Sequence, residues 1–188
     1  SRIMVLYNVS KFLRRLEEMP FNQNPHQFNA KTNTVRVGTG DKAVTIGGNS
    51  TFPFYTFDAP TENSPKIGVE ITDMGLDDFA PGIKAYYEGC TTMAEIAQKA
   101  AAMEGGDFVV LNLEGGDPNG VNKSTEELIA IVKEVADAID CPLVVEGCKN
   151  VEKDAELLPK VAEALQGRNV IVLSEKEEHY KALGAAAG

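Results

Sequence analysis

The sequence predicts an α/β protein built around a parallel sheet, and three features carry this prediction. Short runs of apolar residues alternate with longer amphipathic segments over most of the chain. Within the apolar runs there is almost no alternation with polar residues, which is typical of strands buried on both faces. Polar loops follow the runs, and capping boxes of the S/T-x-x-E type open three of the expected helices.

Four strand–helix units account for most of the chain. They begin near Ile67, Phe108, Leu143 and Val170. In the clearest of them, a turn at 117–120 separates the apolar strand from a helix that a capping box opens at Ser124. The helix expected after Asn150 contains Pro159, which should kink or split it because proline lacks the backbone N–H. A capping box at Ser174 predicts one more helix.

The N-terminal part of the chain differs from these units. Residues 1–32 predict a helix that begins near Ser10 and ends before Pro20, followed by a loop. Alternating runs around a Gly-rich turn predict a β-hairpin over 33–48. Because two strands alone are marginal in water, the hairpin should lie on something larger. The remaining residues, 49–188, form the expected strand–helix domain.

Composition excludes several functions. The 188 residues contain 18 Lys and Arg against 28 Asp and Glu, a net charge of −10, which argues against binding a nucleic-acid backbone. The sequence contains no run of about 18 apolar residues, the length that would predict a membrane span. Three cysteines without a C-x-x-C pair, and two histidines, provide no zinc or iron–sulfur ligand set. Free thiols fit a reducing cytosol, so we expect a cytoplasmic protein.

Polar residues at the strand ends are the candidate site, because parallel α/β folds bind ligands at the carboxyl ends of their strands. These residues are Asp73, Asn112, Glu114, Asp117, Glu146 and Ser174. They can act as acid and base, or hydrogen-bond a heterocycle or a partner's amides. The alternative is that they make turn and cap contacts only. Lys149 is the one basic group near a strand end, no histidine lies there, and no glycine-rich nucleotide motif is present.

The strand–helix pattern leaves two architectures open. A doubly wound sheet can close with four or five strands, whereas a (β/α)8 barrel needs eight strands and about 250 residues. The chain supplies half of such a barrel.

Several segments, in order along the chain, resemble the small subunit of the corrinoid iron–sulfur protein, also known as the delta subunit of the acetyl-CoA decarbonylase/synthase complex. No single segment is decisive, but the ordered set extends over nearly the whole chain from about Val37. The segments are Gly47-Gly48 with Pro53-Phe54, Asn63–Glu70 with Asp73, Leu111–Gly120, Pro142–Cys148 with Val151–Asp154, and His179–Leu183.

The resemblance implies the N-terminal half of a (β/α)8 TIM barrel, preceded by a helix and a hairpin. It implies a heterodimer with a large subunit that carries the iron–sulfur cluster and most of the corrinoid-binding domain, so no cluster is expected on this chain. The pair would pass a methyl group from methyl-tetrahydrofolate or another pterin to acetyl-CoA synthase, in the carbon-fixing acetyl-CoA pathway of anaerobes. The small subunit would cover the corrinoid without being catalytic, and a methyltransferase and acetyl-CoA synthase would bind transiently.

Placing the corrinoid at the strand ends gives the expected cofactor-binding residues. They are Asp73, Asn112, Asp117, Glu146, Gly147 and Ser174, with no catalytic residue and no metal ligand. Two other functions stay open. One is a barrel methyltransferase that binds a pterin through Asp73, Asn112 and Asp117. The other is a metabolic barrel enzyme whose catalytic residues lie in a missing C-terminal half.

The chain departs from the family in its length. The family has about twice as many strand–helix units, as an eight-stranded barrel requires, and this chain ends where a fifth strand should approach. We therefore expect a truncated barrel with an exposed parallel edge, which should self-associate.

Overall fold

The computed structural model describes residues 24–51, 57–173, 176–177 and 179–187. The helix expected from Ser10 and the capping box at Ser174 lie outside these residues. The chain divides into two compact units, residues 1–31 with 49–61 and residues 32–48 with 62–188. In the first unit the backbone N–H of His26 donates to Asp58 Oδ1 over 2.7 Å. The helices and strands of the described residues all belong to the second unit.

A four-stranded parallel sheet forms the centre of the second unit. The strands pair in the order in which they follow one another in the chain, β3-β4-β5-β6, which confirms the predicted parallel α/β fold. Their bounds are Gly68–Thr72 for β3, Phe108–Asn112 for β4, Leu143–Glu146 for β5 and Ile171–Leu173 for β6. The pairing brings the carboxyl ends of the four strands to one edge, with Thr72, Asn112, Glu146 and Leu173 in register.

Five helices of the described residues follow or flank these strands. They are α2 (Pro81–Tyr86), α3 (Met93–Ala101), α4 (Thr125–Ala138), α5 (Val151–Ala164) and α6 (Tyr180–Ala187), with short 3-10 turns η1 (Gly40–Lys42) and η2 (Glu114–Gly116). The capping boxes predicted at Thr92 and Ser124 open α3 and α4, and both halves of each box form.

Pro159 predicts a kink or a split in its helix, and the split does not occur. Helix α5 runs unbroken through Pro159, and the side chain of Asn150 caps it by accepting a hydrogen bond from the backbone N–H of Lys153. Leu158 and Val161, close to the proline on the inner face of the helix, are fully buried. Packing of this face offsets the hydrogen bond that proline removes, because most helix stability in proteins comes from an apolar face that packs.

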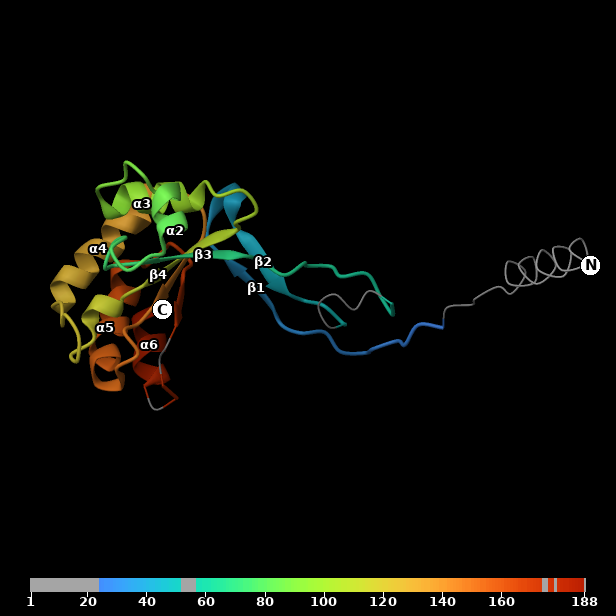
Figure 1. The fold of residues 1–188 in the computed structure, drawn as a ribbon. Helices are drawn as coiled ribbons and strands as arrows, with labels where there is room; N and C mark the ends of the chain where they lie inside the picture. The colour runs from blue at the N-terminus through green and yellow to red at the C-terminus, as the bar shows by residue number, and fades with distance from the viewer. Residues whose placement is uncertain (1–23, 52–56, 174–175, 178, 188) are drawn as a thin grey trace, which may run out of the picture. The chain divides into compact units, whose positions relative to one another are not determined.

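The hydrophobic core lies between one face of the sheet and the helices. Figure 1 shows α3, α4 and α5 side by side along this face. Alternate strand residues point into the core, where they pack with Leu128, Val132, Leu157 and Val161 of the helices. The residues between them, such as Glu70 and Asn112, lie on the opposite face, because side chains alternate along a strand. The core strand residues include Ile71, Val109, Leu111 and Val145.

A β-hairpin covers the amino ends of the strands. Its strands β1 (Thr34–Val37) and β2 (Val44–Gly47) pair in antiparallel fashion. The backbone N–H of Gly38 donates to the carbonyl of Asn169 over 2.7 Å, and the Asn169 side chain donates to the carbonyls of Arg36 and Gly38. Apolar hairpin and strand side chains enclose a space of about 200 Å³. The hairpin therefore rests on the sheet through both polar and apolar contacts.

Candidate functional site

A row of polar side chains marks the carboxyl edge of the sheet, on the face away from the helices. The Asn112 amide donates to Glu70 Oε1 over 3.2 Å. Lys149 Nζ lies 3.4 Å from Glu146 Oε1, and its side chain is 63% exposed. Thr72 is in register with Asn112. We call Glu70, Thr72, Asn112, Glu146 and Lys149 the rim, which offers two carboxylates, an amide, a hydroxyl and an ammonium.

Asp73 fastens the loop after β4 beside the rim. Its side chain is completely buried, and its Oδ1 accepts the backbone N–H of Gly115 over 2.8 Å. Lys123 Nζ donates to Oδ2 over 2.9 Å and to the Asp73 carbonyl over 2.6 Å. A side chain at residue 115 would overlap the Asp73 carboxylate, so glycine is required for this approach. We call this set the first clamp.

Asp154 fastens the loop after β5 in the same way. It is 1% exposed, and its two oxygens accept the backbone N–H groups of Cys148 (2.8 Å) and Lys149 (2.9 Å). The Cys148 thiol donates to Oδ1 over 3.2 Å. A Cβ at Gly147 would lie 2.5 Å from the Asp154 carboxylate. We call this set the second clamp. Both clamps join a buried carboxylate to loop amides beside a glycine.

The predicted site residues divide among these features. Asn112 and Glu146 belong to the rim, Asp73 to the first clamp and Gly147 to the second. Asp117 accepts the backbone N–H and the side-chain amide of Asn119, which is a turn contact. Ser174 lies outside the described residues.

Sequence reasoning did not single out Asp154, although a signal was present. Asp154 falls on the apolar stripe of α5 with Leu157, Leu158 and Val161. An acid at a core position of an amphipathic helix is buried, and a buried carboxylate needs partners.

The surroundings of Cys148 in the second clamp predict that its thiol is unreactive. Burial, together with the neighbouring Asp154 carboxylate, raises the pKa of Cys148 to about 11. Because the thiolate is the nucleophile, labelling of Cys148 in the folded protein should stay slow up to pH 9 and accelerate only near pH 11. The folded state holds this proton longer than the unfolded one, so stability should fall as the pH rises from about 8.5, where an unfolded thiol ionises.

The measurement is the labelling rate against pH in a Cys90→Ser/Cys141→Ser background. The same protein in denaturant serves as the control. Rapid labelling of the folded protein at pH 8 would contradict the prediction.

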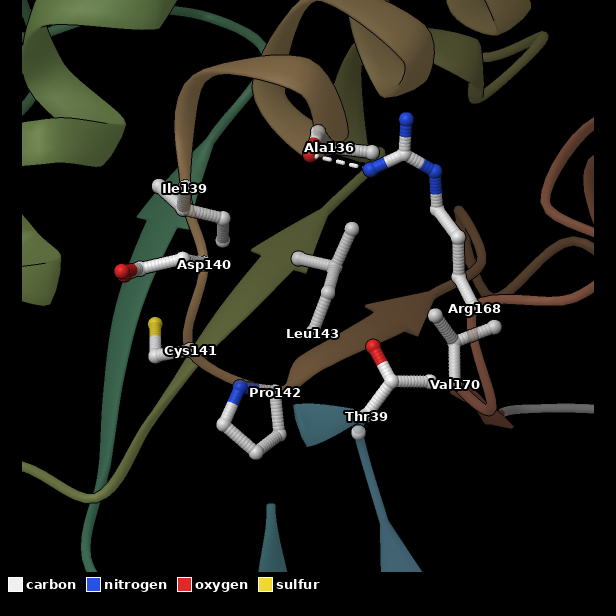
Figure 2. Close-up of a pocket in the computed structure, with 10 residues that line it drawn as sticks. Thr39, Ala136, Ile139, Asp140, Cys141, Pro142, Leu143, Arg168 and Val170 are labelled. Atoms are coloured by element: carbon white, nitrogen blue, oxygen red, sulfur yellow. Dashed lines mark hydrogen bonds between the residues drawn. The ribbon is translucent and has the colours of Figure 1, made fainter. Parts of the chain in front are cut away.

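The end of the strands opposite the rim, their amino end, has a cavity that is too small for a cofactor. Figure 2 shows its lining, with Arg168 reaching the carbonyl of Ala136 at the end of α4 (2.6 Å). Its volume is about 70 Å³, room for a few water molecules. Lys42 of the hairpin pairs with Asp140 beside it. These contacts join α4, the hairpin and the turn before β6, so this end holds the fold together.

Within the described residues, no three His, Cys, Asp or Glu side chains gather as a metal site. None of the helices in that part of the chain is long and apolar enough to cross a membrane.

The fold and the rim together define a parallel α/β protein with a polar edge at the position where such folds hold their ligands. Residues 34–188 match the CO dehydrogenase/acetyl-CoA synthase delta subunit family. The chain belongs to this family, which confirms the resemblance seen in the sequence.

Several curated proteins to which the chain is similar carry the corresponding name. The acetyl-CoA decarbonylase/synthase complex subunit delta of Archaeoglobus fulgidus is 35% identical over 138 residues, 73% of this chain and 30% of that protein. Subunit delta 1 of Methanosarcina thermophila is 28% identical over 96% of this chain and 39% of its own length. Subunit delta of Methanothermobacter thermautotrophicus is 28% identical over 88% of this chain and 43% of its own length. The chain spans less than half the length of these relatives.

Proposed function

We propose that the chain belongs to a non-catalytic subunit of the acetyl-CoA decarbonylase/synthase complex, whose rim covers a corrinoid at the interface with a large corrinoid-carrying subunit. The relatives named above are delta subunits of that complex. The observation that carries the proposal is the structural role of Asp73, the acid that directly follows β3. The first clamp holds Asp73 through Lys123 and Gly115, so this acid is not open to a ligand, and the rim beside it presents exposed side chains that can hydrogen-bond a bound molecule.

The strand order supports the barrel that this function implies. Each strand from β3 to β6 pairs with the next one in the chain, whereas a doubly wound sheet reverses its order at a switch point. We infer that the sheet is the N-terminal half of a (β/α)8 barrel. In a barrel the face away from the helices is the interior, and the rim then stands at the end where barrels hold their ligands.

The rim residues fit the periphery of a corrinoid. A corrin ring bears carboxamide groups, whose N–H donors suit Glu70 and Glu146 and whose carbonyls suit Asn112 and Lys149. Neither histidine of the chain, His26 or His179, follows a sheet strand directly. The rim would therefore hold the edge of the ring. The corrinoid, when bound, supplies the cobalt that carries the methyl group, and the chain supplies position and shielding.

A pterin-binding methyltransferase has less support. That function assigns Asp73, Asn112 and Asp117 to the pterin. Asp73 has no exposed side-chain surface, and Asp117 accepts two hydrogen bonds from Asn119. Only Asn112 belongs to the rim.

An anaerobic co-purification tests the proposal. The chain, and a version extended to the length of its relatives, would each be co-expressed with the large corrinoid-carrying subunit, and the corrinoid absorbance would be followed through gel filtration. We expect corrinoid to elute with the extended chain. An Asn112→Ala/Glu146→Gln double variant should retain about tenfold less corrinoid, the equivalent of about 1.4 kcal/mol.

Asp140→Asn is the matched control, because Asp140 is an exposed acid at the opposite end of the strands. It should retain as much corrinoid as the unaltered protein. If no complex forms although the extended chain is folded, the carrier function is ruled out. Binding of free methyl-tetrahydrofolate would instead favour the methyltransferase.

A further inference from the structure

Lys149 has a backbone conformation that its residue type does not explain. Eight glycines of the described residues have positive φ, as do Asn122 (55°) and Asn169 (53°). Glycine and asparagine tolerate this left-handed region. Lys149, with φ of 69°, is the one residue of another type that adopts it in the described part of the chain. A lysine gains nothing locally from this conformation, so some other contact must account for it.

The second clamp imposes the conformation. Asp154 is buried and accepts the backbone N–H groups of both Cys148 and Lys149, and Asn150 begins the cap of α5 directly afterwards. The result is a lysine side chain that stands at the rim with its ammonium 3.4 Å from Glu146. An exposed ion pair of this kind adds little stability. Strained backbone that the surrounding structure holds in place is found at ligand-binding sites, so the conformation of Lys149 indicates a functional position.

The charges of the rim indicate which ligand group the lysine serves. Glu146 places one carboxylate beside one exposed ammonium, that of Lys149. A charged ligand group would be attracted by one member of this pair and repelled by the other, whereas a neutral group that both donates and accepts can pair with each. A primary carboxamide matches Lys149 and Glu146, because its carbonyl accepts from the ammonium and its N–H donates to the carboxylate.

We propose that Lys149 and Glu146 form a donor–acceptor pair for a peripheral carboxamide of the bound corrinoid, with Asp154 as the positioning residue. This assignment rests on the function proposed above. It makes Lys149 a specificity-determining residue of the rim.

Lys149→Gly separates binding from stability. Glycine removes the strain, so Tm should rise by about 2–4 °C. Retention of corrinoid in the complex with the large subunit should fall about tenfold, because the ammonium is lost. A merely structural lysine would not give these opposite changes. Asn122→Gly is the matched control, since Asn122 has the same backbone conformation in an exposed loop; it should change neither quantity appreciably.

The ligand provides the second arm of the test. Cyanocobalamin would be compared with its separated derivatives in which one carboxamide is hydrolysed to the acid. We expect one derivative to bind the unaltered complex about tenfold more weakly, through repulsion by Glu146, and this difference to shrink in Glu146→Gln. Equal binding of all the derivatives, or tighter binding of the acids, would overturn the assignment.

The two proposals can fail separately. If the unaltered proteins form no corrinoid complex, the function and the assignment that rests on it are both wrong. If the complex forms and Lys149→Gly retains corrinoid as well as before, only the assignment of Lys149 is wrong.

Discussion

Replacing Lys123 with alanine is expected to lower the free energy of unfolding by about 3–5 kcal/mol. The substitution leaves the Asp73 carboxylate with no exposed surface and without its cation, which sits 2.9 Å away. An uncompensated buried charge is among the most costly defects in a folded protein. Urea denaturation monitored by circular dichroism would measure the loss.

A double variant identifies the cause. In Lys123→Ala/Asp73→Asn the buried group is neutral and its oxygen can still accept the N–H of Gly115, so part of the lost stability should return. Lys123→Met serves as the packing control, because it keeps a long side chain and loses only the charge; it should cost nearly as much as Lys123→Ala. If Lys123→Met is harmless, the aliphatic stem rather than the ion pair holds the loop.

Replacing Gly147 with alanine is the second large effect, with an expected loss of about 2–4 kcal/mol. The new Cβ would lie 2.5 Å from a carboxylate that three hydrogen bonds hold in place. Either the clamp opens or the end of β5 moves. Thermal and urea unfolding would give the size of the effect.

The cost of Gly147→Ala should depend on the Asp154 carboxylate of the second clamp. In an Asp154→Ala background the obstructing carboxylate is gone, so Gly147→Ala should cost little more than Asp154→Ala alone. Gly167→Ala is the comparison for strain without collision, because a Cβ at Gly167 would have no atom within 4 Å while φ there is +82°. If the costs of Gly147→Ala and Asp154→Ala add fully, the two residues do not act on each other.

The elements of the fold could be predicted because their signals are local. Apolar runs marked the four strands, and the pairs Thr92–Glu95 and Ser124–Glu127 marked two helix starts. Pro159 predicted a break in its helix that does not occur, because packing that only the folded chain provides offsets the cost of the proline.

The roles of the strand-end acids could not be read in this way. Asp73 directly follows Thr72 of the rim, yet it faces the loop after β4, since one residue changes the direction of a side chain. Its partner Lys123 is 50 residues away. Asp154 was recognisable in principle as an acid in an apolar stripe, but the amides that it holds were not.

The hairpin has a consequence for the order of folding. Its strands are made before the parallel strands, but the contacts that hold them lie far along the chain: Lys42 meets Asp140 across 98 residues, and Arg36 meets Asn169 across 133. A two-stranded hairpin is marginal by itself, so it must wait until the turn before β6 has been synthesised. Closing contacts of such long range is slow. The hairpin residues thus leave the ribosome before the parallel strands do but become stable after them, and until then the amino ends of the parallel strands stay open to water.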